Sequence, residues 1–193
     1  MAEVLLFHHA LGLTDGVVAL ADELRRAGHT VHTPDLFEGR TFDDLEAGVA
    51  YVQEAGFDVL TERGVAAAEG LPKELVYAGI SLGVLPAQKL AQTRPGALGV
   101  LLLSACVPEN AFGPAWPEGV PVQVHATDAD PFFVGDGDLD AARALVAGAE
   151  ERALFLYPGT EHLFMERGSA SYLPEAAEAT VERIRDFLGG LAA

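Results

Sequence analysis

Residues 75–92 read LVYAGISLGVLPAQKLAQ and contain the pattern Gly-x-Ser-x-Gly at positions 79–83. The first six residues are almost all apolar, which is typical of a strand buried on both faces of a parallel sheet. Residues 82–92 have the apolar spacing of a helix. In this pattern the glycines allow a sharp strand-to-helix turn that exposes the serine hydroxyl. Ser81 is therefore a candidate nucleophile, and the competing interpretation is an inert serine in a glycine-rich turn.

Short apolar runs alternate with segments of helical period along the rest of the chain. Such alternation predicts an α/β fold with a mostly parallel, doubly wound sheet flanked by helices. Pro86 interrupts the helix after Ser81 unless the first turn of that helix is displaced. The predicted strands are 4–8, 30–33, 75–80, 99–104, 120–125 and 153–157, and the predicted helices are 15–27, 42–55, 57–69, 82–92, 138–147 and 174–188.

The length and the charge of the chain limit what it can do. With 193 residues, half of them apolar, we expect one domain spanning residues 1–193. The connections between elements are too short for a large cap domain, although the proline-rich stretch 106–119 is a candidate for a short lid. A net charge of −17 disfavours nucleic acid and anionic membrane surfaces as partners.

The single cysteine, Cys106, excludes an internal disulfide and fits a reducing compartment. The first apolar run lacks a basic flank and contains two histidines, so it resembles neither a signal peptide nor a membrane span. We therefore expect a cytoplasmic protein.

A serine nucleophile needs a histidine base that is oriented by a carboxylate, in the chain order Ser, Asp, His. His162 is the histidine that fits, because it lies in a polar loop directly after the last predicted strand. Its competing interpretation is a surface-loop histidine. His125 lies within a strand and is expected to be a core residue. The adjacent His8 and His9 point to opposite faces of a strand end, so no metal site is expected there.

Two aspartates, Asp128 and Asp130, follow the strand between Ser81 and His162, and either could be the acid. Asp130 is favoured because Pro131 disfavours helical backbone at the residue before it and so gives a fixed, extended presentation. The simplest role for the next acidic residues is in a solvated loop and helix N-terminus; these are Asp136, Asp138 and Asp140.

Four segments together resemble the dienelactone hydrolase family of the α/β-hydrolases: residues 5–40, YAGISLGV at 77–84, PVQVHATDADPFF at 121–133 and LYPGTEHLF at 156–164. The resemblance implies an α/β-hydrolase fold, with Ser81 as nucleophile, Asp130 as acid and His162 as base. It also implies an oxyanion hole from the backbone N–H groups of Leu82 and Ala10, and no cofactor or metal.

The sequence departs from the family pattern at the nucleophile and in the first loop. The dienelactone-cleaving members carry a cysteine where this chain has Ser81 and a glutamate where it has His9, and they hold a substrate carboxylate with arginines. Arg40 and Arg167 are the arginines near the expected site in sequence. We therefore expect a serine esterase or lactonase for small, neutral substrates. The alternatives are a thioesterase or peptidase with the same triad, and a non-catalytic scaffold that binds a ligand or partner.

Overall fold

The computed structural model describes residues 1–147 and 149–191. Within them, six strands form one sheet in the order β2-β1-β3-β4-β5-β6, and every neighbouring pair is parallel. This arrangement confirms the predicted α/β fold. The strands are β1 (Glu3–Phe7), β2 (Thr30–His32), β3 (Val76–Ile80), β4 (Gly99–Leu103), β5 (Val122–Thr127) and β6 (Arg152–Tyr157).

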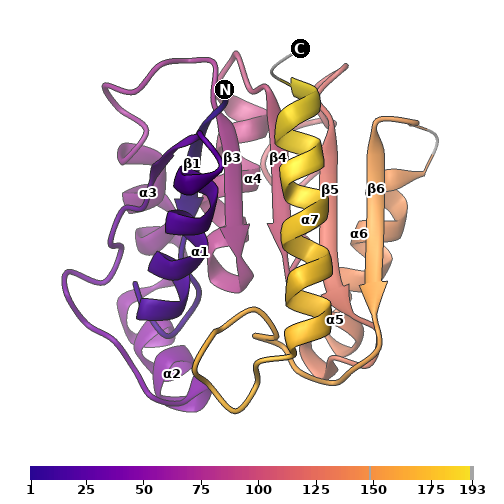
Figure 1. Ribbon diagram of the computed structural model, residues 1–193. Coiled ribbons are helices and arrows are strands. Elements are labelled where there is room, and N and C mark those ends of the chain that lie inside the picture. The colour runs from indigo at the N-terminus through magenta and orange to yellow at the C-terminus, as the bar shows by residue number, and fades with distance from the viewer. Residues whose placement is uncertain (148, 192–193) are drawn as a thin grey trace.

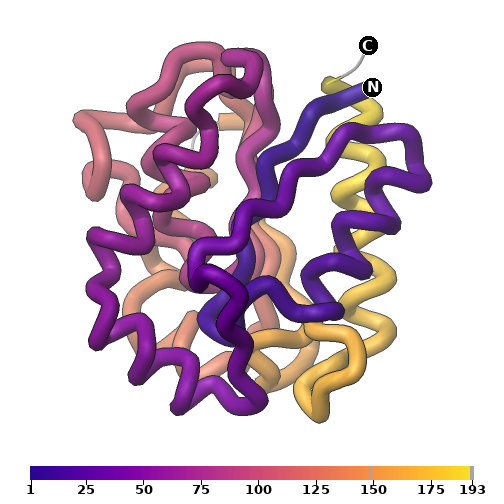
Figure 2. Tube along the Cα trace, turned by 90° about the vertical axis from the view of Figure 1, so that its left-hand side faces the viewer, coloured from indigo at the N-terminus to yellow at the C-terminus, as the bar shows by residue number. Residues whose placement is uncertain are grey.

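Helices cover both faces of the sheet (Figures 1 and 2). One face is covered by α1 and α7, whose apolar residues form one buried cluster with the strands. The other face is covered by α3, α4 and α6, which contribute to a second cluster. The helices are α1 (Asp15–Arg26), α2 (Leu45–Ala55), α3 (Phe57–Ala66), α4 (Val84–Thr93), α5 (Pro131–Gly135), α6 (Asp138–Val146) and α7 (Pro174–Leu191).

The parallel strands give the sheet two chemically different edges. We call the segments that directly follow the strands the carboxyl edge; it comprises residues 8–12, 81–83, 104–106, 128–131 and 158–166. We call the segments that directly precede the strands, together with the first residues of the strands, the amino edge; it comprises residues 1–3, 27–32, 67–76, 94–99, 119–122 and 149–152. All three residues of β2 are included, because β2 pairs only with the first three residues of β1. All strand arrows in Figure 1 point toward the carboxyl edge. In sheets of this type ligands bind at the carboxyl edge.

The predicted elements agree with the observed ones to within a few residues, with two instructive differences. A 3₁₀ turn, Ser81–Gly83, precedes α4, so that α4 begins only at Val84. Pro86 therefore lies in the first turn of α4, where an N–H group has no partner within the helix. The short helix α5 was not predicted, because five residues do not show a helical period.

The proline-rich stretch 106–119 is not a lid. It lies along α4, where the side-chain amides of Gln88 and Gln92 donate to the carbonyls of Val107, Glu109 and Ala115. This stretch is the crossover from the end of β4 back to the start of β5, and its path along the helix layer leaves the carboxyl edge uncovered on that side.

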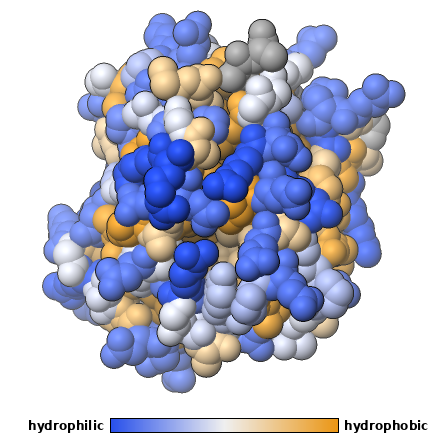
Figure 3. All heavy atoms as spheres, viewed as in Figure 1, coloured by the Kyte–Doolittle hydropathy of each residue, from blue (hydrophilic) through white to orange (hydrophobic). Residues whose placement is uncertain are grey.

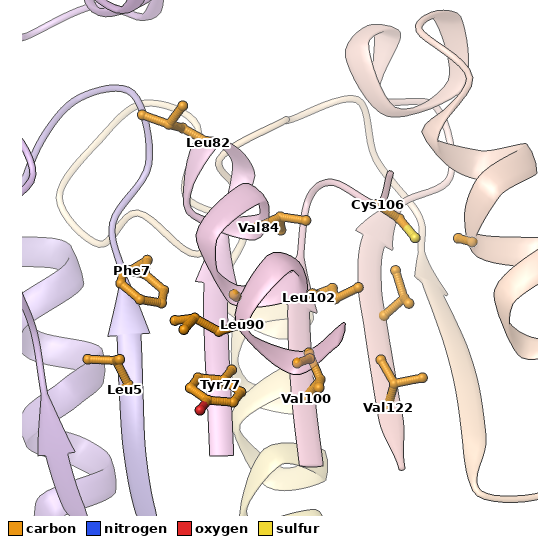
Figure 4. Packing of buried hydrophobic residues seen from close by; sticks show 14 of the residues in the cluster. Leu5, Phe7, Tyr77, Leu82, Val84, Leu90, Val100, Leu102, Cys106 and Val122 are labelled. Carbon is orange, nitrogen blue, oxygen red and sulfur yellow. The ribbon is translucent and has the colours of Figure 1, made fainter. Parts of the chain in front are cut away.

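The core beneath α4 is closely packed (Figure 4). Tyr77, Leu90 and Phe7 are each at most 1% exposed, while Leu82 lies at the turn beyond β3. By contrast, the surface over α1 and α7 is largely hydrophilic, with apolar atoms visible between them (Figure 3). Among the described residues, no helix combines the length and the apolar character needed to cross a membrane.

Candidate active site

The turn after β3 requires both glycines of the Gly-x-Ser-x-Gly pattern. A Cβ atom on Gly79 would lie 2.1 Å from the carbonyl oxygen of Gly83. A Cβ atom on Gly83 would lie 2.4 Å from the carbonyl oxygen of Phe7, at the end of β1. Ser81 itself has a φ of 50°, which is uncommon for a residue with a side chain and marks a strained turn. The sequence therefore folds here into a tight elbow that packs against β1.

The elbow and two other segments of the carboxyl edge bring together the three side chains that the sequence predicted. Ser81 Oγ lies 2.8 Å from His162 Nε2, and His162 Nδ1 lies 2.6 Å from Asp130 Oδ2. A carboxylate only accepts hydrogen bonds, so Nδ1–H donates to Asp130 and Nε2 is left to accept the Ser81 hydroxyl. This continuous chain of hydrogen bonds can move a proton from the serine to the imidazole.

The structure distinguishes Asp130 from Asp128. Asp130 is fully buried and is the N-cap of α5, where its Oδ1 accepts the Phe132 N–H at 2.9 Å. Its backbone is extended, with φ −58° and ψ 117°, as Pro131 leads one to expect. Asp128 is exposed, and its Oδ1 accepts the Gly159 N–H at 3.1 Å. Asp128 therefore closes a loop, and Asp130 contacts the histidine.

Two backbone segments of the carboxyl edge carry Leu82 and Ala10, the residues predicted to supply the oxyanion donors. Leu82 lies in the first helical turn after Ser81, where N–H groups have no earlier carbonyl to bond. Ala10 lies in the turn after β1, and the close approach of Gly83 to Phe7 and His8 sets the elbow directly against that segment. Both residues are buried, at 7% and 4% exposure. The arrangement can offer two N–H groups to a developing negative charge.

The family model for the dienelactone hydrolase family matches residues 1–191. The chain belongs to the dienelactone hydrolase family. No curated protein sequence matches it.

Solved structures of dienelactone hydrolases and other hydrolases share the fold. A dienelactone hydrolase-like promiscuous phosphotriesterase from metagenomic libraries superposes with a TM-score of 0.78 at 17% identity, covering 99% of this chain and 87% of that one. The dienelactone hydrolase of Anabaena variabilis gives 0.68 at 17% identity, covering 98% and 86%. Esterase 2 of Thermogutta terrifontis, phosphonylated by sarin, gives 0.70 at 12% identity, covering 98% and 84%. At these identities the likeness supports the fold alone.

This member of the dienelactone hydrolase family has an unpredicted buried pair beside its triad. His9 Nε2 lies 2.7 Å from Glu166 Oε2, and the two side chains are 1% and 9% exposed. No sequence signal indicated this pair, because its partners are 157 positions apart. His8 binds elsewhere: its Nε2 accepts the Leu36 N–H at 2.9 Å, and burial lowers its pKa to about 4.

The two arginines that could have bound a substrate carboxylate are engaged elsewhere. Arg167 lines a groove of about 310 Å³ between α1 and α7, where it lies 3.6 Å from Glu23. The Arg40 guanidinium lies 5.2 Å from the centre of the Tyr51 ring. Five aromatic residues follow predicted strands and are therefore candidates to line the site. Of these, Phe37, Phe164 and Trp116 are buried core residues, and Phe112 lies against Lys89.

The fifth aromatic residue, Phe132, does belong to the site. Its ring centre lies 4.9 Å from that of His162, and the residue is 43% exposed. An exposed aromatic ring against the histidine gives the site an apolar wall.

The surroundings of Asp138, at the start of α6, differ from those that the sequence predicted. Asp138, expected to be solvated, is partly buried, and its Oδ2 accepts the Cys106 N–H at 3.0 Å. Burial raises the pKa of Asp138, and the nearby Asp136 carboxylate adds to this effect against the opposing bond from Cys106. Cys106 is buried, and burial raises the pKa of its thiol to about 12. A thiol that stays protonated is no nucleophile.

His125 is a core residue, as expected. Its Nδ1 and Nε2 lie 2.9 Å from the Tyr157 hydroxyl and 3.1 Å from Gln123 Oε1. Among the residues that the structure describes, no three histidine, cysteine or acidic side chains lie close enough together to hold a metal ion.

Proposed function

We propose that this member of the dienelactone hydrolase family is a serine hydrolase that cleaves small, neutral esters or lactones through an acyl-enzyme intermediate. The observation that carries the proposal is the chain of hydrogen bonds from Ser81 Oγ through His162 to the fully buried Asp130. Such a chain supplies the nucleophile, the general base and the group that stabilises the imidazolium.

The geometry suits a two-step reaction. As Ser81 Oγ attacks the carbonyl carbon, His162 Nε2 takes the hydroxyl proton, and Asp130 stabilises the imidazolium that forms. The N–H groups of Leu82 and Ala10 would bind the oxygen that becomes negative. The imidazolium then gives its proton to the leaving alkoxide, which leaves the acyl group on Ser81. A water molecule, deprotonated by the same nitrogen, releases the acid and restores Ser81.

Charge favours neutral substrates. Several acidic side chains lie at or beside the carboxyl edge, and Asp130, Asp138 and Glu166 are among them. The two arginines considered for a carboxylate contact are engaged with Glu23 and Tyr51. With a net charge of −17 on the chain, an anionic substrate is repelled at long range. Short acyl chains fit best, because no large cap covers the described residues and long chains would stay in water.

The first test is covalent labelling. An esterase of the same fold is phosphonylated by sarin, so a fluorophosphonate probe followed by mass spectrometry is a suitable assay. We expect the label on Ser81, and we expect Ser81→Ala to abolish both labelling and ester cleavage while circular dichroism shows the native fold. Ser171→Ala is the control and keeps both. A label elsewhere, or undiminished turnover by Ser81→Ala, would refute the proposal.

The second test compares substrates by their kcat/KM values. Acetyl and butyryl esters of a good leaving group are expected to exceed dienelactone, a long-chain ester, a matched thioester and a matched amide. Best turnover of the thioester or the amide would support the thioesterase or peptidase alternative. Binding without any turnover would support a scaffold role, and preference for dienelactone would contradict the charge argument.

A further inference from the structure

The buried pair of His9 and Glu166 uses both nitrogens of the His9 imidazole. Nε2–H donates to the Glu166 carboxylate at 2.7 Å, and Nδ1 accepts the Leu11 N–H at 3.2 Å. Since both nitrogens are occupied by groups of the chain and the side chain is 1% exposed, His9 has no nitrogen left to exchange a proton with a substrate. Any role of the pair in the reaction is therefore exerted through other residues.

Glu166 is held at the start of α1. The Thr14 hydroxyl and the Gly16 backbone lie close to its carboxylate and, together with His9, stabilise its charged form. Burial raises the pKa of Glu166. The contact with His9 lowers the pKa, as do Thr14 and Gly16, and together they outweigh burial and leave the pKa of Glu166 below its ordinary value. A Cβ atom on Gly16 would lie 2.5 Å from the carboxylate. The absence of a side chain at Gly16 is thus what lets Glu166 occupy this position.

The pair adjoins the chain neighbours of both reacting residues. His9 and Glu166 line a small void of about 10 Å³ together with Ile80 and Leu163. Ile80 directly precedes Ser81, and Leu163 directly follows His162. The pair therefore joins the turn after β1 to the histidine loop at a point directly beside the triad.

The turn that contains Ala10 is fixed through His9. The carbonyl oxygen of His9 accepts the Gly12 N–H at 3.0 Å and the His8 Nδ1–H at 2.8 Å. Leu11 N–H and Gly12 N–H both donate to His9, whereas the N–H group of Ala10, the residue directly after His9, donates to no group in the described part of the chain. The turn thus holds one N–H group available while its neighbours are occupied.

We propose that His9 and Glu166 act as positioning residues, which hold the Ala10 N–H at the correct place relative to Ser81 and His162 for binding the oxyanion. This inference rests on the proposed function. An oxyanion donor works only when it is aimed at the position that the negative oxygen reaches in the transition state. A shift of the donor by about 1 Å is enough to lose much of its effect.

The test separates positioning from folding. Glu166→Ala is expected to lower kcat by roughly 10²-fold, the usual effect of losing one oxyanion donor, with little change in KM. The affinity for a trifluoromethyl ketone, whose adduct with Ser81 carries an oxyanion, should fall in parallel with kcat/KM. Glu166→Gln keeps an acceptor for His9 Nε2–H and should restore most of kcat.

Gly16→Ala provides an independent variant, because it displaces the carboxylate without removing either partner. It should reproduce the loss of kcat and of ketone affinity. Gly189→Ala is the matched control, since a Cβ atom at that helical position meets nothing within 4 Å. Glu3→Ala removes another histidine–glutamate contact, that of His32 with Glu3 at 2.8 Å, and should leave kcat unchanged.

Unchanged kcat in folded Glu166→Ala or Gly16→Ala would overturn the inference while leaving the proposed function intact. So would a loss that appears only in KM or in melting temperature. If Glu166→Ala does not fold, Gly16→Ala decides the question in its place. A wild-type protein whose Ser81 neither reacts with the fluorophosphonate nor supports turnover would instead refute the proposed function, and this inference with it.

Discussion

The two edges of the sheet carry the same kind of contact, between a histidine and a carboxylate, in different surroundings. At the amino edge, His32 Nε2 lies 2.8 Å from Glu3, and both side chains are about one third exposed. At the carboxyl edge, His162 Nδ1 lies 2.6 Å from Asp130, and the side chains are 11% and 0% exposed. Only at the carboxyl edge does the second imidazole nitrogen face a hydroxyl group, that of Ser81. The comparison teaches that burial and the second nitrogen's partner, not the contact itself, distinguish a reactive pair.

Glycines also differ between the two edges. At the amino edge, Gly28 and Gly70 have positive φ angles and open space where a Cβ atom would be. At the carboxyl edge, Gly79 and Gly83 have ordinary φ angles, but a Cβ atom would meet backbone atoms at 2.1 and 2.4 Å. Gly28 and Gly70 therefore serve chain reversal, whereas Gly79 and Gly83 serve close backbone approach.

The largest effect expected from this comparison is on the rate. Asp130→Asn should lower kcat by about 10⁴-fold, because the imidazole loses both its charged partner and its correct tautomer. Asp128→Asn, which changes only a loop contact, should cost roughly tenfold or less. Glu3→Gln at the amino edge should leave kcat unchanged. Steady-state kinetics on a short neutral ester measures all three, and a larger loss for Asp128→Asn would transfer the role of acid to Asp128.

The next effect is on stability. Gly83→Ala should lower the free energy of unfolding by about 3 kcal/mol, since backbone atoms of β1 must move to admit the methyl group. Gly189→Ala, near the C-terminal end of α7, should instead raise the free energy of unfolding by up to about 1 kcal/mol, because alanine favours a helix more than glycine does. Urea unfolding of both variants measures the difference. Equal stabilities would show that the elbow is looser than the distances indicate.

The periodicity of the sequence predicted the fold well, because each strand is a short apolar run and each long helix has an apolar face. All six strands lie within two residues of their predicted positions. The helix α5 escaped prediction because its five residues follow from Asp130 as N-cap and Pro131 at the first position, not from a hydrophobic pattern. Pro86 was expected to interrupt the helix unless the first turn is displaced, and the 3₁₀ turn Ser81–Gly83 displaces it, so that Pro86 lies in the first turn of α4. This 3₁₀ turn has no sequence signal of its own.

The candidate triad could be selected from the sequence because its residues all directly follow strands. Parallel strands end at one edge, so the order Ser, Asp, His was enough to single out Ser81 and His162 and to reduce the acids to two. The sequence favoured Asp130 over Asp128 through Pro131 and through the resemblance to the dienelactone hydrolase family, and burial then separated the two aspartates. The catalytic roles of these residues stay predictions.

Contacts between distant segments could not be predicted. The pair of His9 and Glu166 depends on Gly16 leaving room for a carboxylate, and nothing in the local sequence of either partner shows it. Asp138 looked like a solvated helix start, yet the Cys106 N–H binds it from another strand end. Side-chain partners across the sheet edge are set by packing, which a local pattern does not encode.

His125, which lies within β5 between the two edges, tests how burial acts on a histidine that has no carboxylate partner. Burial lowers its pKa to about 3, so between the ordinary value of 6.5 and that value the unfolded chain binds a proton that the folded chain does not. The free energy of unfolding therefore falls as the pH falls through this range, by up to about 1.4 kcal/mol per pH unit for one such group. His125→Gln should remove this contribution.

Urea unfolding at about pH 6 and about pH 5 gives the change of the free energy of unfolding with pH for the wild-type protein and for His125→Gln. This slope should be smaller for the variant by about 1 kcal/mol per pH unit. His8, whose pKa burial also lowers, keeps its own contribution in both proteins and so cancels. Identical slopes would mean that His125 takes up a proton within the folded sheet.

The smallest effect on stability and activity is expected from a change at the amino edge. A small effect there follows if only the carboxyl edge is reactive. His32→Ala removes the contact with Glu3, but both groups are partly exposed, and exposed ion pairs contribute only about 0–1 kcal/mol to stability. The variant should therefore unfold at nearly the wild-type urea concentration and keep the wild-type kcat. High salt should reduce even this difference, because the pair is reached by solvent. A loss of activity in folded His32→Ala would show that the two edges are coupled through β1, and the contrast between a reactive edge and an inert one would then fail.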